Sequence, residues 1–254
     1  MFSSKSIDAT PVWMRDAAVS RDKHGRPRSS SLAGSLAQQI IDSIVNGQYA
    51  VAERLPSEAD LAEIGGMSRL TVREAIKTLQ ERGVVTVRRG IGTFVNHPDR
   101  WSPLHMNVLV ARAALLGDNN YAQISTDLLE ARSFIEIGVA GLAAERRTDE
   151  ELGRMKSALT SMRERFDEIE IFVEADIDFH DALMSAAGNS ILAATYQPIH
   201  DLFYATRMET AKSSANRLIA IKSHEDILAA VEVRDQERAK STMALHLDEA
   251  KSMF

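Results

Sequence analysis

The stretch LPSEADLAEIGGMSRLTVREAIKTLQERG, residues 55–83, decides how the N-terminal part of this chain folds. It predicts two short helices joined by a turn at its paired glycines, because glycine ends helices. Ser57 is placed to cap the first helix, with Asp60 as the acid of a capping box. Ser68 is placed to cap the second helix. The spacing therefore predicts a helix-turn-helix.

The second of these helices has two different faces. Apolar residues recur on one arc at helical spacing, and these are Val72, Ala75, Ile76 and Leu79. Beside that arc, Arg69, Arg73 and Lys77 follow one another at four-residue intervals and form a basic stripe. A solvated amphipathic helix has the same pattern, but so does a recognition helix that enters the major groove of DNA.

The segment that follows favours the DNA-binding interpretation. VVTVRRGIGTFV, residues 84–95, contains two β-rich runs around a turn that holds Arg89 and Gly90. A helix-turn-helix followed by a hairpin with a basic tip is a winged helix.

Several short motifs in this region resemble the DNA-binding signature of GntR-family transcription regulators, from about residue 36 to residue 95. The motifs are Leu55-Pro56-Ser57-Glu58, Ser68-Arg69, Thr71-Val72-Arg73-Glu74-Ala75, Gly83 and Gly90-Ile91-Gly92-Thr93-Phe94-Val95. The resemblance implies DNA contacts from Ser57, Ser68, Arg69, Thr71, Arg73, Arg89 and Gly90. One departure is Ala59, where the family often has a further basic residue.

Composition and charge restrict the class of protein. The chain has 254 residues, 44% of them hydrophobic and 26% charged, which is typical of soluble globular proteins. It has no cysteine, no membrane-length apolar run and no signal-peptide core, so we expect a cytoplasmic protein that does not contact a membrane. Residues 1–97 hold 13 Lys and Arg against 10 Asp and Glu, a net charge of +3. Residues 98–254 hold 17 against 26, a net charge of −9, so the cations concentrate at the DNA-binding end.

The chain divides into three parts. Residues 1–30 are polar and aperiodic, and we expect a flexible N-terminal extension. Residues 31–97 form the predicted winged helix-turn-helix domain, and residues 98–254 form an all-α effector-binding and dimerisation domain packed as an antiparallel bundle. After an apolar helical segment that starts near Trp101, the bundle helices are expected at 122–146, 149–165, 168–187, 190–211, 215–233 and 235–252.

Four polar residues fall on the apolar faces of three bundle helices. Asp176 and His180 lie four residues apart in the helix 168–187, and His224 and His246 interrupt the inner faces of two later helices. A single histidine at such a position is usually a hydrogen-bonded core residue. Together, the four side chains are a candidate divalent-cation site for Zn²⁺, Ni²⁺ or Mn²⁺.

The bundle also resembles a known domain. Asp176-Ile177-Asp178-Phe179-His180, the following Gly188-Asn189, Ser223-His224 and His246-Leu247 resemble the FCD effector domain of the FadR subfamily. That resemblance implies a metal held by Asp176, His180, His224 and His246.

Arg132 interrupts the apolar stripe of the first bundle helix. Its i+4 neighbour Glu136 offers a simple explanation, an intrahelical ion pair at the bundle edge. Alternatively, its guanidinium points into the metal cavity and holds a carboxylate, as the matching arginine of the family often does. The expected effector-binding residues are Arg132, Asp176, Tyr196, Arg207, Asn216 and His224.

These patterns predict a metabolite-responsive DNA-binding transcription regulator and not an enzyme. We expect a homodimeric repressor that binds a palindromic double-stranded operator. Its effector is expected to be a small organic or sugar acid bound by the metal and Arg132. A metal-dependent enzyme that uses the same His/Asp site is the alternative.

Overall fold

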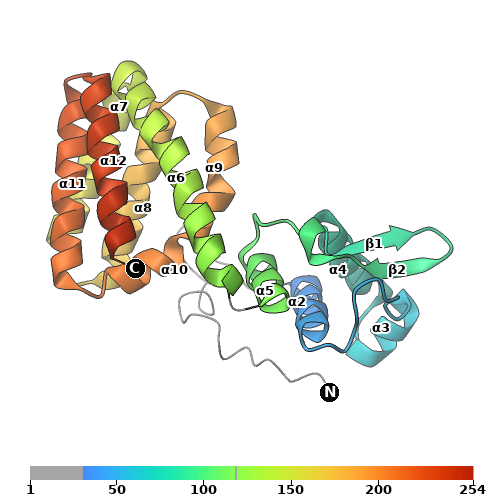
Figure 1. Cartoon of the computed structure of the whole chain (residues 1–254). Helices are drawn as coiled ribbons and strands as arrows, with labels where there is room; N and C mark the ends of the chain where they lie inside the picture. Colours follow the sequence, from blue (N-terminus) through green and yellow to red (C-terminus); the bar gives the residue numbers. More distant parts are fainter. Residues whose placement is uncertain (1–30, 118, 254) are drawn as a thin grey trace. The chain divides into compact units, whose positions relative to one another are not determined.

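A computed structural model describes residues 31–117 and 119–253 of the chain (Figure 1). These residues form two compact units, and the boundary in the sequence lies between Ile124 and Ser125. Each unit is described by itself. The N-terminal extension predicted for residues 1–30 lies outside the described residues. Among the residues described, no helix is long and apolar enough to cross a membrane.

The first unit has a winged helix-turn-helix architecture. Its helices and strands are α2 (Leu32–Val45), α3 (Glu58–Gly65), α4 (Arg69–Glu81), β1 (Val85–Arg88), β2 (Gly92–Val95), the 3-10 helix η2 (Pro98–Arg100) and α5 (Met106–Leu116). The two strands pair in antiparallel register, with Val85 opposite Val95. The predicted apolar arc of α4 is buried along its whole length, which packs this helix on the core of the unit.

Side-chain caps make the turn between α3 and α4. The Asp60 amide donates to Ser57 Oγ at 3.2 Å, and the Ser57 amide donates to Asp60 Oδ2 at 3.1 Å, so the predicted capping box is present. Gly66 ends α3 in the left-handed conformation with φ 58°, which glycine adopts without strain. The Thr71 amide then donates to Ser68 Oγ at 3.1 Å and starts α4.

The segment after the wing differs from the prediction, which placed everything beyond residue 97 in the second domain. Trp101 is 1% exposed in the core of the first unit, and its indole Nε1 donates to the Asn96 carbonyl at 3.1 Å. A Cβ at Gly83, which has a φ of 74°, would lie 2.2 Å from the Arg100 carbonyl oxygen. The chain thus returns onto the end of α4, and α5 packs on α2 with its apolar face.

The second unit is a helical bundle. Its helices are α6 (Asn119–Arg146), which begins just before the unit boundary, α7 (Asp149–Glu164), α8 (Ile169–Ala186), α9 (Ser190–Leu202), α10 (Tyr204–Thr210), α11 (Ser214–Glu232) and α12 (Gln236–Ser252). Short turns join α7 to α8 and α11 to α12, and the helices of each pair pack side by side (Figure 1). An apolar core lines the facing sides of these helices.

The prediction of one helix over residues 190–211 is wrong, because the chain forms α9 and α10 there. The Phe203 amide donates to the His200 carbonyl three residues back at 3.0 Å, a tight turn that ends α9. The Phe203 carbonyl then accepts from the Arg207 amide at 2.9 Å and begins α10. Phe203 itself is 4% exposed, so its buried ring anchors the break.

Candidate nucleic-acid interface and metal centre

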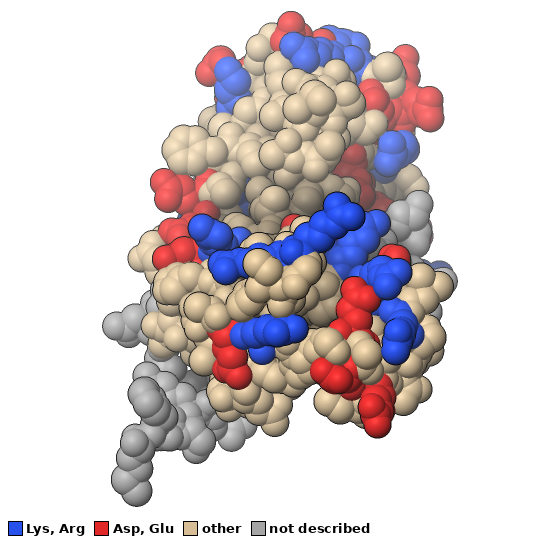
Figure 2. Space-filling model, turned by 90° about the vertical axis from the view of Figure 1, so that its right-hand side faces the viewer, with Lys and Arg blue, Asp and Glu red and all other residues tan. Residues whose placement is uncertain are grey.

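Exposed cations follow α4 on the surface of the first unit. Arg69, Arg73 and Lys77 are all exposed, and Figure 2 shows Lys and Arg side chains gathered in a band across one face of the molecule. Arg73 pairs with Glu58 of α3, with Nη2 at 3.1 Å and Nε at 3.3 Å from Oε2. Because both side chains are partly in water, this pair is weak and can exchange for a ligand.

The wing carries further cations. Arg88 lies over the Phe94 ring, with its guanidinium carbon 4.6 Å from the ring centre. Arg89 and Gly90 occupy the turn between β1 and β2 and are exposed. Gly92, the first residue of β2, has a φ of 140°, a conformation that favours glycine, and a Cβ there would displace the Arg54 side chain, whose Nε would lie 2.4 Å away.

The predicted hydroxyl contacts have local structural roles. Ser57 and Ser68 cap α3 and α4, and Thr71 Oγ1 lies 2.9 Å from Ser68 Oγ. These groups remain at the N-terminal ends of the two helices, where backbone N–H groups favour anions.

The second unit brings the predicted histidines together. One ring nitrogen each from His180 of α8, His224 of α11 and His246 of α12 lies within 4.8 Å of the other two. All three side chains are buried. Asp176 lies beside them, with its Oδ1 3.2 Å from His224 Nε2.

The hydrogen bonds of His224 show that this arrangement fits a cation. His224 Nδ1 lies 2.6 Å from the Ala220 carbonyl oxygen, so Nδ1 carries the proton and donates. In neutral His224, Nε2 then has a lone pair, and it faces the negative Oδ1 of Asp176. His224 Nε2 is buried and has no hydrogen-bond partner among the described residues, and a divalent cation shared with Asp176 would satisfy both atoms.

The Nε2 atoms of His180 and His246 are also buried, without a hydrogen-bond partner among the described residues. The residues present therefore fit a metal bound by three imidazoles and one carboxylate.

Arg132 and Glu136 do not lie at the bundle edge, which corrects the simpler explanation of this pair. They are 4% and 2% exposed, and Arg132 Nε donates to Glu136 Oε1 at 2.6 Å. The Tyr196 hydroxyl donates to the same carboxylate oxygen. Glu136 Oε2 lies 3.0 Å from His180 Nδ1, so this carboxylate connects the guanidinium with the histidine cluster.

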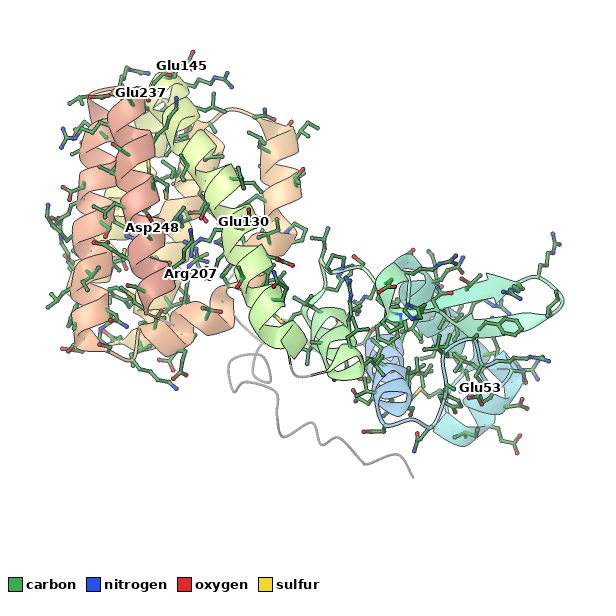
Figure 3. The ribbon with its side chains drawn as sticks, in the orientation of Figure 1. Glu53, Glu130, Glu145, Arg207, Glu237 and Asp248 are labelled. Carbon is green, nitrogen blue, oxygen red and sulfur yellow. The ribbon has the colours of Figure 1, made fainter. Side chains whose placement is uncertain are left out.

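Arg207 makes the second guanidinium–carboxylate pair of the site. Its Nε lies 2.7 Å from Asp176 Oδ2, while its buried Nη1 and Nη2 have no hydrogen-bond partner among the described residues. Figure 3 shows Arg207 among the helices of the bundle, whereas Glu145 and Glu237 lie at one end of it.

A cavity of about 60 Å³ opens at this place. Four predicted effector-binding residues line it, together with the metal-ligand candidate His246; they are Arg132, Asp176, Arg207 and Asn216. Tyr196 and His224 are not part of that lining. Tyr196 instead bonds to Glu136, and His224 lies beside Asp176.

Burial and neighbouring charges set the protonation of these groups. Burial opposes ionisation of Asp176, but Arg207 and His224 outweigh it and hold the pKa of this carboxyl well below its usual value. Arg132 and His180 do the same for the pKa of Glu136. Burial, together with His224, lowers the pKa of His246 well below its usual value. The directions of these shifts favour ionised Asp176 and Glu136 and a neutral His246. Carboxylates and neutral imidazoles are the forms that coordinate a cation.

Sequence reasoning missed two residues of this network. Glu136 was recognised only as a partner of Arg132, and His200 was not considered. His200 is 3% exposed, its ring centre is 5.5 Å from that of Tyr196, and its Nε2 has no hydrogen-bond partner among the described residues. The i+4 spacing of Tyr196 and His200 was the available signal.

Comparison with known families identifies both parts of the chain. Residues 32–95 match the family described as bacterial regulatory proteins, gntR family, and residues 127–249 match the FCD domain. The HTH-type transcriptional regulator LutR of Bacillus subtilis is 32% identical over 83% of this chain and 95% of its own length.

The galactonate operon transcriptional repressor of Escherichia coli is 30% identical over 78% of this chain and 85% of its own length. Among solved structures, one described as Lar, which controls the expression of the Listeria monocytogenes agr system, has a TM-score of 0.57 at 21% identity. It covers 89% of this chain and 97% of its own length, which supports the same fold.

Proposed function

Because this chain belongs to the GntR family of DNA-binding transcription regulators and carries an FCD domain, we propose that its second unit binds a divalent metal and a small carboxylic acid that controls operator binding. The family matches and the relatives are transcription regulators, so the chain is a regulator and not a metal-dependent enzyme.

The observation that carries the metal proposal is the close approach of His224 Nε2 and Asp176 Oδ1 at 3.2 Å, with Nε2 buried and without a hydrogen-bond partner among the described residues. His180 and His246 supply two further imidazoles. Zn²⁺, Ni²⁺ and Mn²⁺ all accept imidazole and carboxylate ligands, and the residues alone do not choose among them. Such a cation supplies a positive centre that binds carboxylate or hydroxyl oxygens of a ligand.

Arg207 supports the carboxylate as effector group. Its Nη1 and Nη2 are buried and have no hydrogen-bond partner among the described residues, and a carboxylate accepts two parallel N–H bonds from such a fork. Arg132 and Asn216 line the same cavity. A small organic or sugar acid fits this chemistry, and the relative named for a galactonate operon points to sugar acids as the first class to test.

We further propose that the protein is a homodimeric repressor that binds a palindromic operator. Two recognition helices related by two-fold symmetry require two half-sites. A groove on the second unit supports self-association, because Leu129, Phe134 and Ile137 line it and Phe134 is 78% exposed. Light scattering of Phe134→Asp should show a monomer where the wild type shows a dimer.

The metal proposal is tested by elemental analysis of the purified protein, with about one equivalent of cation per chain expected. His224→Ala and His246→Ala should each lower the occupancy and the melting temperature together, because metal binding stabilises the folded state. His200→Ala is the matched control, a buried histidine outside the cluster, and should keep the metal. Unchanged occupancy in both His224→Ala and His246→Ala would show that these histidines are ordinary core residues.

The acid proposal is tested by a melting screen with small monocarboxylates, dicarboxylates and sugar acids. A ligand of the site should raise the melting temperature of the wild type and of Arg163→Ala, a substitution at a surface ion pair. Arg207→Lys, which keeps the charge and loses the fork, should lose that shift. A shift that is the same in Arg207→Lys would place the acid elsewhere.

A further inference from the structure

The two carboxylates beside the histidine cluster contact different ring nitrogens. Asp176 Oδ1 lies 3.2 Å from Nε2 of His224, the nitrogen left free by the bond from Nδ1 to the Ala220 carbonyl. Glu136 Oε2 approaches Nδ1 of His180 to 3.0 Å without completing a hydrogen bond. His180 Nε2 is also buried and has no hydrogen-bond partner among the described residues. Asp176 is therefore placed to share a cation with His224. Glu136 instead faces Nδ1 of His180 and leaves the other ring nitrogen, Nε2, for the cation.

The two oxygens of Glu136 face different groups, and among the described residues only Oε1 accepts hydrogen bonds. Oε1 accepts a hydrogen bond from Arg132 Nε and another from the Tyr196 hydroxyl. Both groups act as donors here, so this side of residue 136 has to be an acceptor. The hydrogen bond from the Arg132 guanidinium favours the ionised form of this carboxyl. A negative Oε2 at 3.0 Å from His180 Nδ1 favours a proton on that nitrogen over a lone pair.

We propose that Glu136 is a positioning residue that fixes the tautomer of His180, with the proton on Nδ1 and the lone pair of Nε2 directed at the metal site. His180 then matches His224, whose Nδ1 proton is held by the Ala220 carbonyl. The role of this tautomer in coordination rests on the proposed metal function. The tautomer itself can be measured in metal-free protein.

Glu136 also connects the metal site with the effector cavity. The same carboxylate that orients His180 holds Arg132, which lines the cavity. Phe203 supports that guanidinium from α9–α10, with its ring centre 5.2 Å from the guanidinium carbon. Removing the carboxylate therefore affects the metal ligand and the effector-facing arginine together, although Glu136 itself is not among the residues that line the cavity.

The decisive variant is Glu136→Gln, which has nearly the same shape but only one acceptor oxygen. Arg132 and Tyr196 both donate to one side of this group, so the amide oxygen should face them. The amide NH2 then faces His180 Nδ1 and favours a lone pair there, which moves the proton to Nε2 and blocks coordination. A residue that served only to pack the core would not change this tautomer.

The experiment measures the nitrogen and proton shifts of the histidine rings by long-range NMR correlation in metal-free protein. Wild type should show His180 protonated on Nδ1, and Glu136→Gln should show the Nε2-protonated form. Zinc titration should then give a dissociation constant about 10–100-fold higher in the variant. Glu225→Gln is the matched control, the same change at a carboxylate that pairs with Arg163 on the bundle surface, and it should keep the wild-type tautomer and zinc affinity.

Three results would overturn the inference. One is a wild-type His180 that carries its proton on Nε2, a measurement that does not require any variant to fold. The others are an unchanged tautomer in Glu136→Gln, or an equal loss of zinc affinity in Glu225→Gln. If wild type has the expected tautomer but binds no zinc, the proposed metal function fails while the positioning role of Glu136 stands.

Discussion

The arginines of the two units differ in their access to water. Arg73 on α4 pairs with Glu58 at 3.1 Å, and 65% and 38% of the two side chains are exposed. Arg132 and Arg207 pair with carboxylates at 2.6 Å and 2.7 Å, and their side chains are 5% and 9% exposed. An exposed pair contributes little to stability and is easily exchanged for DNA. A buried pair is costly to form and more costly to break, so its presence indicates a site that needs the charge.

The largest expected effect follows from breaking a buried pair. Arg207→Ala leaves the Asp176 carboxylate buried next to His224 without its guanidinium, and we expect a loss of about 3–5 kcal/mol in the unfolding free energy of metal-free protein. Arg163→Ala, which breaks the surface pair with Glu225, should cost about 0–1 kcal/mol. Urea unfolding measures the loss of unfolding free energy in each variant. Equal losses in Arg207→Ala and Arg163→Ala would contradict the distinction between buried and exposed pairs.

The pH dependence of stability should be the next largest effect, because several buried imidazoles act in one direction. Burial lowers the pKa of His180, His200 and His246 in the folded protein. Histidines of the unfolded chain have a pKa near 6.5. Between that pH and the lower pKa of the folded state, the unfolded chain therefore binds more protons than the folded protein. Stability of metal-free protein should be complete above about pH 6.5 and fall as the pH decreases below it.

Replacing a buried histidine separates the contribution of the imidazoles to the pH dependence of stability from that of the carboxylates. The pKa values of Asp176 and Glu136 are lowered, so their contribution is lost only below about pH 4. His200→Gln should flatten the decline in unfolding free energy between pH 7 and pH 5. An identical decline in this variant and in wild type would exclude His200 as a contributor.

The exposed arginines should affect DNA binding without changing stability. Arg69→Ala and Arg73→Ala should each cost about 1–3 kcal/mol of operator affinity if they read bases, with an unchanged melting temperature. A gel shift with the operator, found by selection from random double-stranded DNA, measures this. Glu63→Ala, an exposed α3 substitution, serves as control. Wild-type affinity in the Arg69→Ala, Arg73→Ala double variant would exclude α4 as the recognition helix.

The smallest expected effect concerns the wing. Arg89 is exposed at the turn between β1 and β2. We expect it to contact a phosphate rather than a base. Arg89→Ala should weaken binding evenly across DNA sequences and reduce the slope of log K against log salt by about 1. Fluorescence anisotropy at several salt concentrations measures this slope, and a sequence-selective loss would instead indicate base contact.

The sequence predicted the features that depend on local spacing. The capping box at Ser57, the cap at Ser68 and the buried arc of α4 follow from three- and four-residue intervals, and the structure has them. The same intervals put Asp176 and His180 on one face of α8, where both are buried. Local motifs also carried the resemblance to the GntR family and the FCD domain, which the family matches confirm.

Other features depend on contacts between residues far apart in the chain, and only the tertiary structure decided them. Trp101 and α5 pack on the first unit, because the chain turns back onto Gly83 and α2. The break at Phe203 places Arg207 against Asp176. Glu136 contacts Tyr196 and His180, which lie 60 and 44 positions away in the sequence. Helical periodicity shows which face a side chain occupies, but not which side chains of other helices it meets there.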